Sequence, residues 1–91
     1  MPTRVEATVD NPLGLHARPA MLLAQKADEF SSVIKIGRKD RADLVDAKSI
    51  MHLLMLAATQ GTSLEIVAEG TDEAEAANAL ADLVRTRFEE D

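Results

Sequence analysis

The sequence predicts a small α+β domain, a two-layer open-faced sandwich in which a four-stranded antiparallel sheet carries three helices on one face. Segments in which apolar and polar residues alternate are interleaved with segments in which apolar residues recur every three or four positions, which gives the order β-α-β-β-α-β-α. The chain has 91 residues, so a single domain spanning residues 1–91 is the economical interpretation. Helices packed on one face of such a sheet bury its apolar side.

The first half of the chain begins with a strand, a turn and a helix. Residues 4–9 alternate and predict a half-buried strand with Val5, Ala7 and Val9 on one face. Residues 10–14 are a turn cluster that contains Asn, Pro and Gly. From Ala17 to about residue 30 the period becomes helical, and the apolar face is made of Ala20, Leu23, Ala24 and Ala27.

The middle of the chain predicts two strands and a short helix. Residues 33–37 form the second strand, the charged sequence GRKDR forms a loop, and a short third strand lies near residues 42–45. Residues 49–58 predict a helix, with Gly61 as a plausible left-handed cap.

The last third predicts one strand and one long helix. Residues 63–69 alternate in polarity. Thr71 or Asp72 is expected to cap a helix that runs to about Phe88, with acidic residues in its first turn and Arg85 near its end, as the helix dipole prefers.

Composition excludes several functional classes. The net charge is −6 without a basic run, and there are two Phe but no Trp or Tyr, which argues against nucleic-acid binding and against an anionic membrane surface as partner. The absence of cysteine excludes disulfides, thiolate zinc sites and thiol catalysis. No signal peptide or transmembrane stretch is evident, so we expect a cytoplasmic protein, and no cofactor is predicted.

The candidate site is the segment from Gly14 to Pro19. Gly14 permits a tight turn, and Pro19 is tolerated in the first turn of a helix, so His16 is expected where the turn ends and the helix begins. The amides around Ala17 and Arg18 then have no intrahelical acceptor, and the helix dipole adds positive charge there. The Arg18 guanidinium adds donors suited to phosphate oxygens, so a phosphoryl group on His16 would lie among hydrogen-bond donors that are already in place.

Spacing alone leaves other interpretations of these residues open. His16 can be a helix cap and Arg18 a solvated surface residue. A metal site would need His16 and His52, the two histidines of the chain, together with carboxylates that the sequence does not place. A third alternative is a domain that holds a free anion at the helix N-terminus without forming a phosphohistidine.

Two segments resemble the HPr family, the histidine-containing phosphocarriers of the bacterial phosphoenolpyruvate-dependent sugar phosphotransferase system. Residues 11–20, NPLGLHARPA, resemble its active-site signature, and residues 14–20 match the pattern Gly-Leu-His-x-Arg-Pro-Ala in full. Residues 46–66 resemble the family's regulatory-serine region. The order of strands and helices also agrees with the HPr fold.

The resemblance implies a phosphoryl relay rather than an enzyme with its own turnover. Enzyme I would donate phosphate to His16, at Nδ1 by family analogy, Arg18 would stabilise it, and a IIA-type domain would accept it. Ser49 matches the serine modified by HPr kinase/phosphorylase in many relatives, although its position also suits the N-cap of the second helix. An alternative is a nitrogen-related or regulatory paralogue whose phosphorylation state, at His16 and Ser49, signals to other proteins.

The second helix has two apolar stripes, which a short helix on one face of a sheet cannot both bury. Ile50, Leu53, Leu56 and Ala57 form the stripe that we assign to the core. Met51, Leu54 and Met55 form a second stripe, which predicts partner contact unless Met51 or Met55 packs against a loop. The candidate docking residues, with Ile50 counted in both sets, are Leu22, Lys48, Ile50, Met51, Leu54 and Met55.

Two departures from the family pattern concern local geometry. Leu13 stands where several relatives carry a polar residue that hydrogen-bonds near the active site. The GRKDR loop is about two residues longer than in well-known members, and we expect no effect of this loop on the chemistry. A monomer is expected, because one site must serve two partners in turn.

Overall fold

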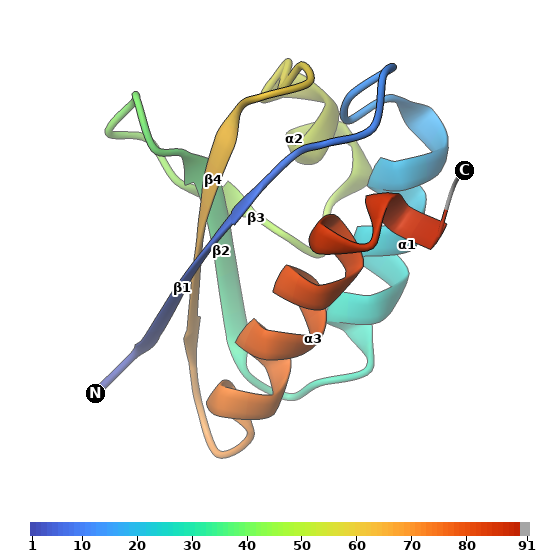
Figure 1. The fold of residues 1–91 in the computed structure, drawn as a ribbon. Helices are drawn as coiled ribbons and strands as arrows, with labels where there is room; N and C mark the ends of the chain where they lie inside the picture. The colour runs from blue at the N-terminus through green and yellow to red at the C-terminus, as the bar shows by residue number, and fades with distance from the viewer. Residues whose placement is uncertain (90–91) are drawn as a thin grey trace.

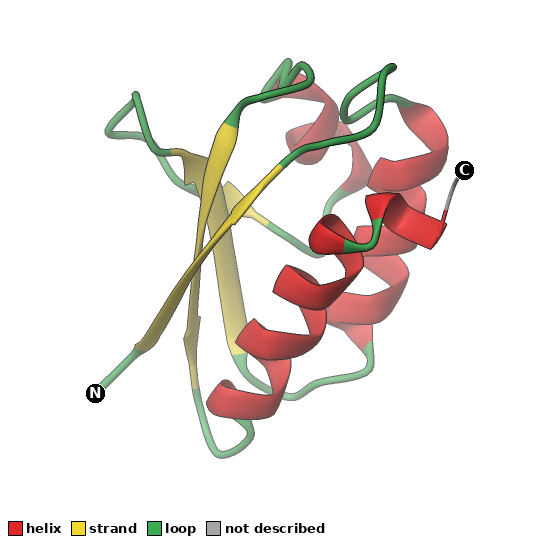
Figure 2. Cartoon of the chain, in the orientation of Figure 1, coloured by secondary structure: helices red, strands yellow, loops and turns green. Residues whose placement is uncertain are grey.

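The computed structural model describes residues 1–89 and confirms the predicted two-layer architecture. Four strands form one sheet, and helices α1, α2 and α3 pack against the same side of it (Figure 1). A short 3-10 helix, Arg87–Glu89, follows the third helix. Figure 2 shows every helix of the described chain on one side of the sheet, so the sheet's opposite face is open.

Neighbouring strands are antiparallel and lie in the order β1-β4-β2-β3. Ile66 in the central strand lies opposite Val5 on one side and Ile36 on the other, so the apolar residues of three strands share one face. The strands are β1 (Thr3–Thr8), β2 (Val33–Arg38), β3 (Val45–Asp46) and β4 (Ser63–Glu69). The predicted fourth strand is thus confirmed without a shift.

The third strand is shorter and later than predicted. It contains Val45 and Asp46 instead of residues 42–45, because only Ile36 and Lys35 of β2 pair with it. Gly37 lies against the loop between β2 and β3, and a β-carbon there would lie 2.5 Å from the Asp43 carbonyl oxygen. Residues 39–44 lie in this loop, outside the strands.

The helices are α1 (Ala17–Asp28), α2 (Ile50–Met55) and α3 (Glu73–Arg85). The prediction of a second helix over residues 49–58 is wrong at its end, because Ala57 takes a left-handed φ of 51°. Gly61 also has a positive φ, but its amide donates to the Val9 carbonyl in the turn before β4, so it does not cap α2.

The third helix also ends earlier than predicted. Helix α3 stops at Arg85, and Arg87 and Phe88 both take positive φ values, so the chain turns back on itself. Phe88 is nevertheless 1% exposed. Phe88 reaches the core through a tight reversal of the backbone after α3 and not as part of the helix itself.

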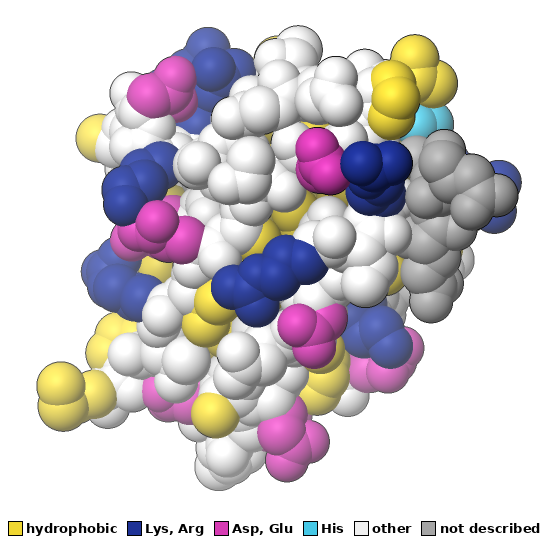
Figure 3. All heavy atoms as spheres, viewed as in Figure 1, with side chains coloured by type: hydrophobic (Ala, Val, Ile, Leu, Met, Phe, Trp, Pro, Cys, Tyr) yellow, Lys and Arg dark blue, Asp and Glu magenta, His cyan; other side chains and the backbone are white. Residues whose placement is uncertain are grey.

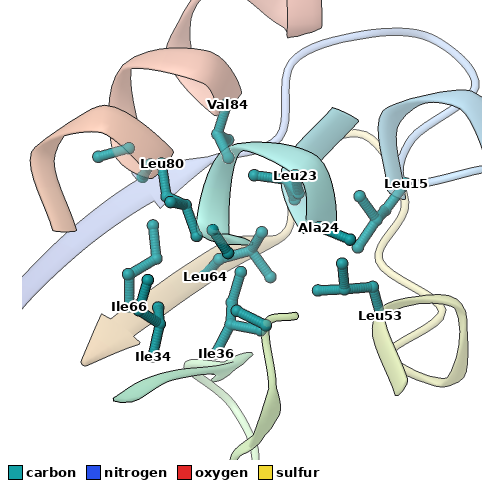
Figure 4. Packing of buried hydrophobic residues seen from close by; sticks show 14 of the residues in the cluster. Leu15, Leu23, Ala24, Ile34, Ile36, Leu53, Leu64, Ile66, Leu80 and Val84 are labelled. Atoms are coloured by element: carbon teal, nitrogen blue, oxygen red, sulfur yellow. The ribbon is translucent and has the colours of Figure 1, made fainter. Parts of the chain in front are cut away.

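The hydrophobic core fills the space between the sheet and the helices. Figure 4 shows Leu23 of α1, Leu53 of α2 and Leu80 of α3 converging on Ile34, Ile36, Leu64 and Ile66 of the sheet. Leu15 joins this core immediately before His16. The core therefore extends to the backbone of the candidate site.

Candidate functional site

His16 lies at the junction between the turn after β1 and the first residue of α1. It occupies the N-cap position with an extended backbone, φ −87° and ψ −169°, and its carbonyl accepts the first helical hydrogen bond from the Ala20 amide at 3.0 Å. The imidazole makes no capping hydrogen bond to the helix. The predicted location is thus confirmed: His16 is the N-cap residue by its backbone position, without a capping hydrogen bond from its side chain.

The residues before His16 are fixed by close contact with the segment after α2. Gly14 has φ 67°, and a β-carbon there would lie 2.4 Å from the Ala58 carbonyl oxygen. The same carbonyl accepts the Leu15 amide at 2.8 Å. Because Leu15 is buried as well, the peptide that leads into His16 has little freedom to move.

The first turn of α1 is suited to an anion. Ala17 and Arg18 hold the first two helical amides, which have no intrahelical acceptor, and the third position is Pro19, which has no amide hydrogen. The turn contains no acidic residue that would offset the positive end of the helix dipole. Ala17 and Arg18 are both exposed, so an anion at His16 can reach these donors from solvent.

Asp10 is anchored by residues that the sequence analysis did not single out. The Arg87 side chain contacts Asp10 Oδ2 through Nε and Nη2, each at 3.0 Å, and Gln60 Nε2 donates to the Asp10 carbonyl at 2.9 Å. These contacts tie the start of the site turn to the 3-10 helix after α3 and to the turn before β4. The partners are remote in sequence, so no local pattern could have revealed them.

Ser49 is the N-cap of α2, as expected. Its Oγ accepts the His52 amide at 3.2 Å, and its carbonyl accepts the Leu53 amide at 3.0 Å. The residue is half-buried, and its hydroxyl lies at the positive end of a short helix.

The candidate docking residues differ in how far they reach solvent. Met51 is 74% exposed and Met55 70%, whereas Ile50 and Leu54 are each 41% exposed. Ile50 therefore does not belong to the core, and neither does Ala57, which is exposed beyond the early end of the helix. Of the stripe assigned to the core, the structure buries Leu53 and Leu56.

Leu22 and Lys48 are less available. Leu22 is half-buried against the core, on the same side of α1 as Lys26, which lines a depression with Leu83 of α3. The Lys48 ammonium donates to the Phe30 carbonyl at 2.9 Å. Both side chains are therefore engaged within the domain.

Two apolar residues near His16 are exposed: Met21, which was missed, and Leu13, which was noted only as a departure from the family pattern. Met21 is 40% exposed one helical turn after Ala17, and Leu13 is 75% exposed in the site turn. Met21 is i+3 from Arg18, so helical spacing could have placed it beside the site. Helices α1 and α2 are in contact, which brings Met21 onto the helical layer that also carries Met51 and Met55.

The surface charges are mixed. On the face shown in Figure 3, acidic and basic side chains lie next to each other rather than in large areas of one sign. Ion pairs include Arg4–Glu65 at 3.1 Å and Arg38–Asp40 at 3.0 Å.

Across residues 1–89, no three histidine or carboxylate side chains gather as potential metal ligands. No helix in that range is long and apolar enough to cross a bilayer.

Comparison with known proteins gives a consistent result. The model of a family described as "PTS HPr component phosphorylation site" matches residues 3–86. The phosphocarrier protein HPr of Pseudomonas aeruginosa is 44% identical over 86 residues, which cover 94% of each chain. A crystal structure of HPr from Thermoanaerobacter tengcongensis matches with a TM-score of 0.89 and 43% identity over 98% of each chain. A structure described as an HPr dimer from the same organism matches at 45% identity, with a TM-score of 0.75 over 90% of this chain and 92% of the other.

Proposed function

The chain belongs to the HPr family, and on this premise we propose that it is a phosphocarrier of the phosphotransferase system that holds the phosphoryl group on His16. The observation that carries the assignment to His16 is its place at the N-terminus of α1, beside the amides of Ala17 and Arg18. The nitrogen-related or regulatory alternative uses the same chemistry at His16, and no described residue favours it.

The reaction is a transfer between two nitrogen atoms. A His16 ring nitrogen attacks the phosphorus of a phosphohistidine on enzyme I, so the new N–P bond forms as the donor's N–P bond breaks. In the second transfer, a nucleophile of a IIA-type domain attacks the phosphorus on His16, so the acceptor's new bond forms as the His16 N–P bond breaks. Catalysis of phosphoryl transfer is mostly positioning and electrostatic stabilisation, which the helix N-terminus and the Arg18 guanidinium supply here.

The proposal is tested by intact-mass analysis after incubation with phosphoenolpyruvate and purified enzyme I. The wild type should gain one acid-labile phosphoryl group, and His16→Ala should gain none. His52→Ala is the matched control, because it removes the other histidine, which is exposed on α2, and should leave phosphorylation unchanged. A wild type that stays unmodified, or a His16→Ala variant that is still modified, would overturn the proposal.

Both partners dock on one apolar surface, the α2 patch, which consists of Ile50, Met51, Leu54 and Met55. Methionine side chains adapt to different partner surfaces, which suits a carrier that must bind a donor and an acceptor in turn. Met21 extends this patch along α1. Leu22 and Lys48 contribute at its margin only through the parts of their side chains that reach solvent, because both are partly engaged within the domain. The protein works as a cytoplasmic monomer, because each partner needs the whole site.

Ser49 is the site of a second, regulatory phosphorylation by a kinase of the HPr kinase/phosphorylase type. Its hydroxyl lies at the N-terminus of α2, where a phosphate is favoured by the helix dipole, and the residue immediately precedes the α2 patch. The added negative charge would weaken docking without changing the fold. Ser49→Asp should lower the rate of His16 phosphorylation, whereas Ser49→Ala should not; equal rates would contradict this role.

A further inference from the structure

Asn11 is a buried polar residue in the turn that leads to His16. It is 1% exposed, and together with Ser32 it makes up the buried polar residues within the described chain. Ser32 is satisfied by the Asp72 carboxylate, far along the chain from the site. Burying an amide is costly unless it is hydrogen-bonded, so the contacts of Asn11 should explain its position.

Asn11 holds both sides of the Gly14 residue. Its side-chain Nδ2 donates to the Gly14 carbonyl at 2.7 Å, and its own carbonyl accepts the Gly14 amide at 3.0 Å. The His16 amide donates to the same Gly14 carbonyl, also at 3.0 Å. One carbonyl oxygen therefore accepts hydrogen bonds from the Asn11 side chain and from the backbone of His16.

We propose that Asn11 is a positioning residue for phosphoryl transfer, acting through the Gly14 carbonyl to hold the backbone of His16. The inference rests on the proposed function of His16. On its other side Gly14 lies against the backbone of Ala58, so the turn is held between the buried Asn11 side chain and the Ala58 carbonyl. Without the Asn11 donor, the Gly14 peptide can rotate, and the extended backbone that presents the imidazole is no longer fixed.

The effect falls on the transfer step and not on docking. Asn11 is buried, so it offers no surface to a partner. A small displacement of a reacting group costs far more in rate than in binding, on the order of tenfold or more. Loss of the Asn11 donor therefore lowers the rate at saturating donor and leaves the KM for enzyme I nearly unchanged.

The test uses Asn11→Asp and Asn11→Ala in the full chain. The aspartate is nearly isosteric but cannot donate when ionised, and the alanine removes the group altogether. Asn78→Asp is the matched control, because Asn78 Nδ2 also donates to a backbone carbonyl, that of Ala74 at 2.8 Å, on the exposed side of α3. Single-turnover phosphorylation by enzyme I is measured per folded molecule, with the folded fraction taken from circular dichroism.

The expected result is a fall on the order of tenfold in the saturating rate of both Asn11 variants, with KM unchanged, a shifted His16 amide resonance, and a wild-type rate for Asn78→Asp. If Asn11→Asp fails to fold, Asn11→Ala decides the question. Asn11 variants that are less stable but transfer phosphate at the wild-type rate per folded molecule would show a purely structural role and overturn the inference. A wild type that is not phosphorylated on His16 would instead defeat the proposed function.

Discussion

The geometry of His16 depends on a backbone contact that only glycine permits. Gly14 has a left-handed φ of 67° and lies against the Ala58 carbonyl, so both its conformation and its surroundings exclude a β-carbon. The turn is held on its other side by Asn11, and the buried Leu15 anchors the next residue. The backbone that carries the reactive side chain is thus held on both sides of the turn.

Gly14→Ala is expected to lower both the stability of the domain and the rate of phosphorylation. The left-handed conformation costs an L-residue about 1–2 kcal/mol, and the contact with Ala58 adds to this, because the neighbouring atom is backbone and cannot turn aside. Gly61→Ala is the control, since Gly61 has φ 93° with no atom near a built β-carbon. Urea denaturation should show the larger loss for Gly14→Ala; equal losses would contradict this account.

The sequence allowed prediction of the residues whose roles depend on local structure. His16, Arg18 and Gly14 lie within one turn and its helix, where glycine, proline and the helix N-terminus have known preferences. Asn11 was not singled out, because its importance depends on burial. Arg87 was missed because its contact with Asp10 spans 77 residues of sequence.

At the level of elements, the early end of α2 has a tertiary cause. Apart from His52, the sequence from Ile50 to Ala58 is apolar, and it contains no helix breaker, so periodicity predicted a longer helix. In the structure, Ala57 takes φ 51° and the Arg38 guanidinium donates to the Ala57 carbonyl at 3.2 Å. Arg38 belongs to β2, so its contact could not be read from the helical segment. Arg38 lies in the GRKDR segment, which therefore contacts the chain one residue before Ala58.

Ala57→Gly should stabilise the domain. Glycine adopts the left-handed conformation without the strain that an L-residue has there. Its greater conformational entropy in the unfolded chain offsets part of this gain, which leaves a net stabilisation of up to about 1 kcal/mol. Ala79→Gly, in the middle of α3, is the opposite control and should destabilise by about 1 kcal/mol. The measurement is thermal denaturation of both variants. An equal loss of stability in Ala57→Gly and Ala79→Gly would contradict the strain at Ala57.

Asp72 connects the start of α3 to the loop after α1, and this link should depend on pH. Its carboxylate accepts the Ser32 hydroxyl and the Ser31 and Ser32 amides, which lowers the pKa of Asp72 from 3.8 to about 2. A lowered folded-state pKa means that the stabilisation is complete above pH 4 and is lost as the pH falls toward 2.

Asp72→Asn should therefore be less stable than the wild type at pH 7, and the difference should shrink between pH 4 and pH 2. Urea denaturation across this range measures it. Asp28→Asn is an exposed substitution on α1, and the difference between its free energy of unfolding and that of the wild type should stay near zero from pH 7 to pH 2. A stability gap for Asp72→Asn that stayed constant down to pH 2 would contradict the link.

For the whole molecule, the sequence predicted the layers but not the arrangement of the strands. The alternation of periods indicated four strands and three helices, and burial of one sheet face required the helices to lie together. The order β1-β4-β2-β3 brings strands from opposite ends of the chain into contact, as Ile66 and Val5 show. Such pairing depends on the packed core and has no local signature.

The docking proposal predicts an effect confined to one end of the molecule. Met51→Ser combined with Met55→Ser should raise the KM for enzyme I and for the acceptor, each on the order of tenfold, with little change in stability because both side chains are exposed. Val33→Ser is the control: Val33 is 60% exposed at the opposite end of the sheet and should leave both KM values unchanged. An effect on only one partner would show that the two dock differently.

The α2 patch belongs to one short helix, and this has a kinetic consequence. On the proposed docking mode, donor and acceptor cannot occupy the same side chains at once, so we expect transfer by double displacement, without a ternary complex. Unphosphorylated enzyme I then acts as a competitive inhibitor of delivery to the acceptor, and an excess of acceptor slows reloading in the same way. Flux through the relay is therefore set by the ratio of the two partners as well as by their amounts.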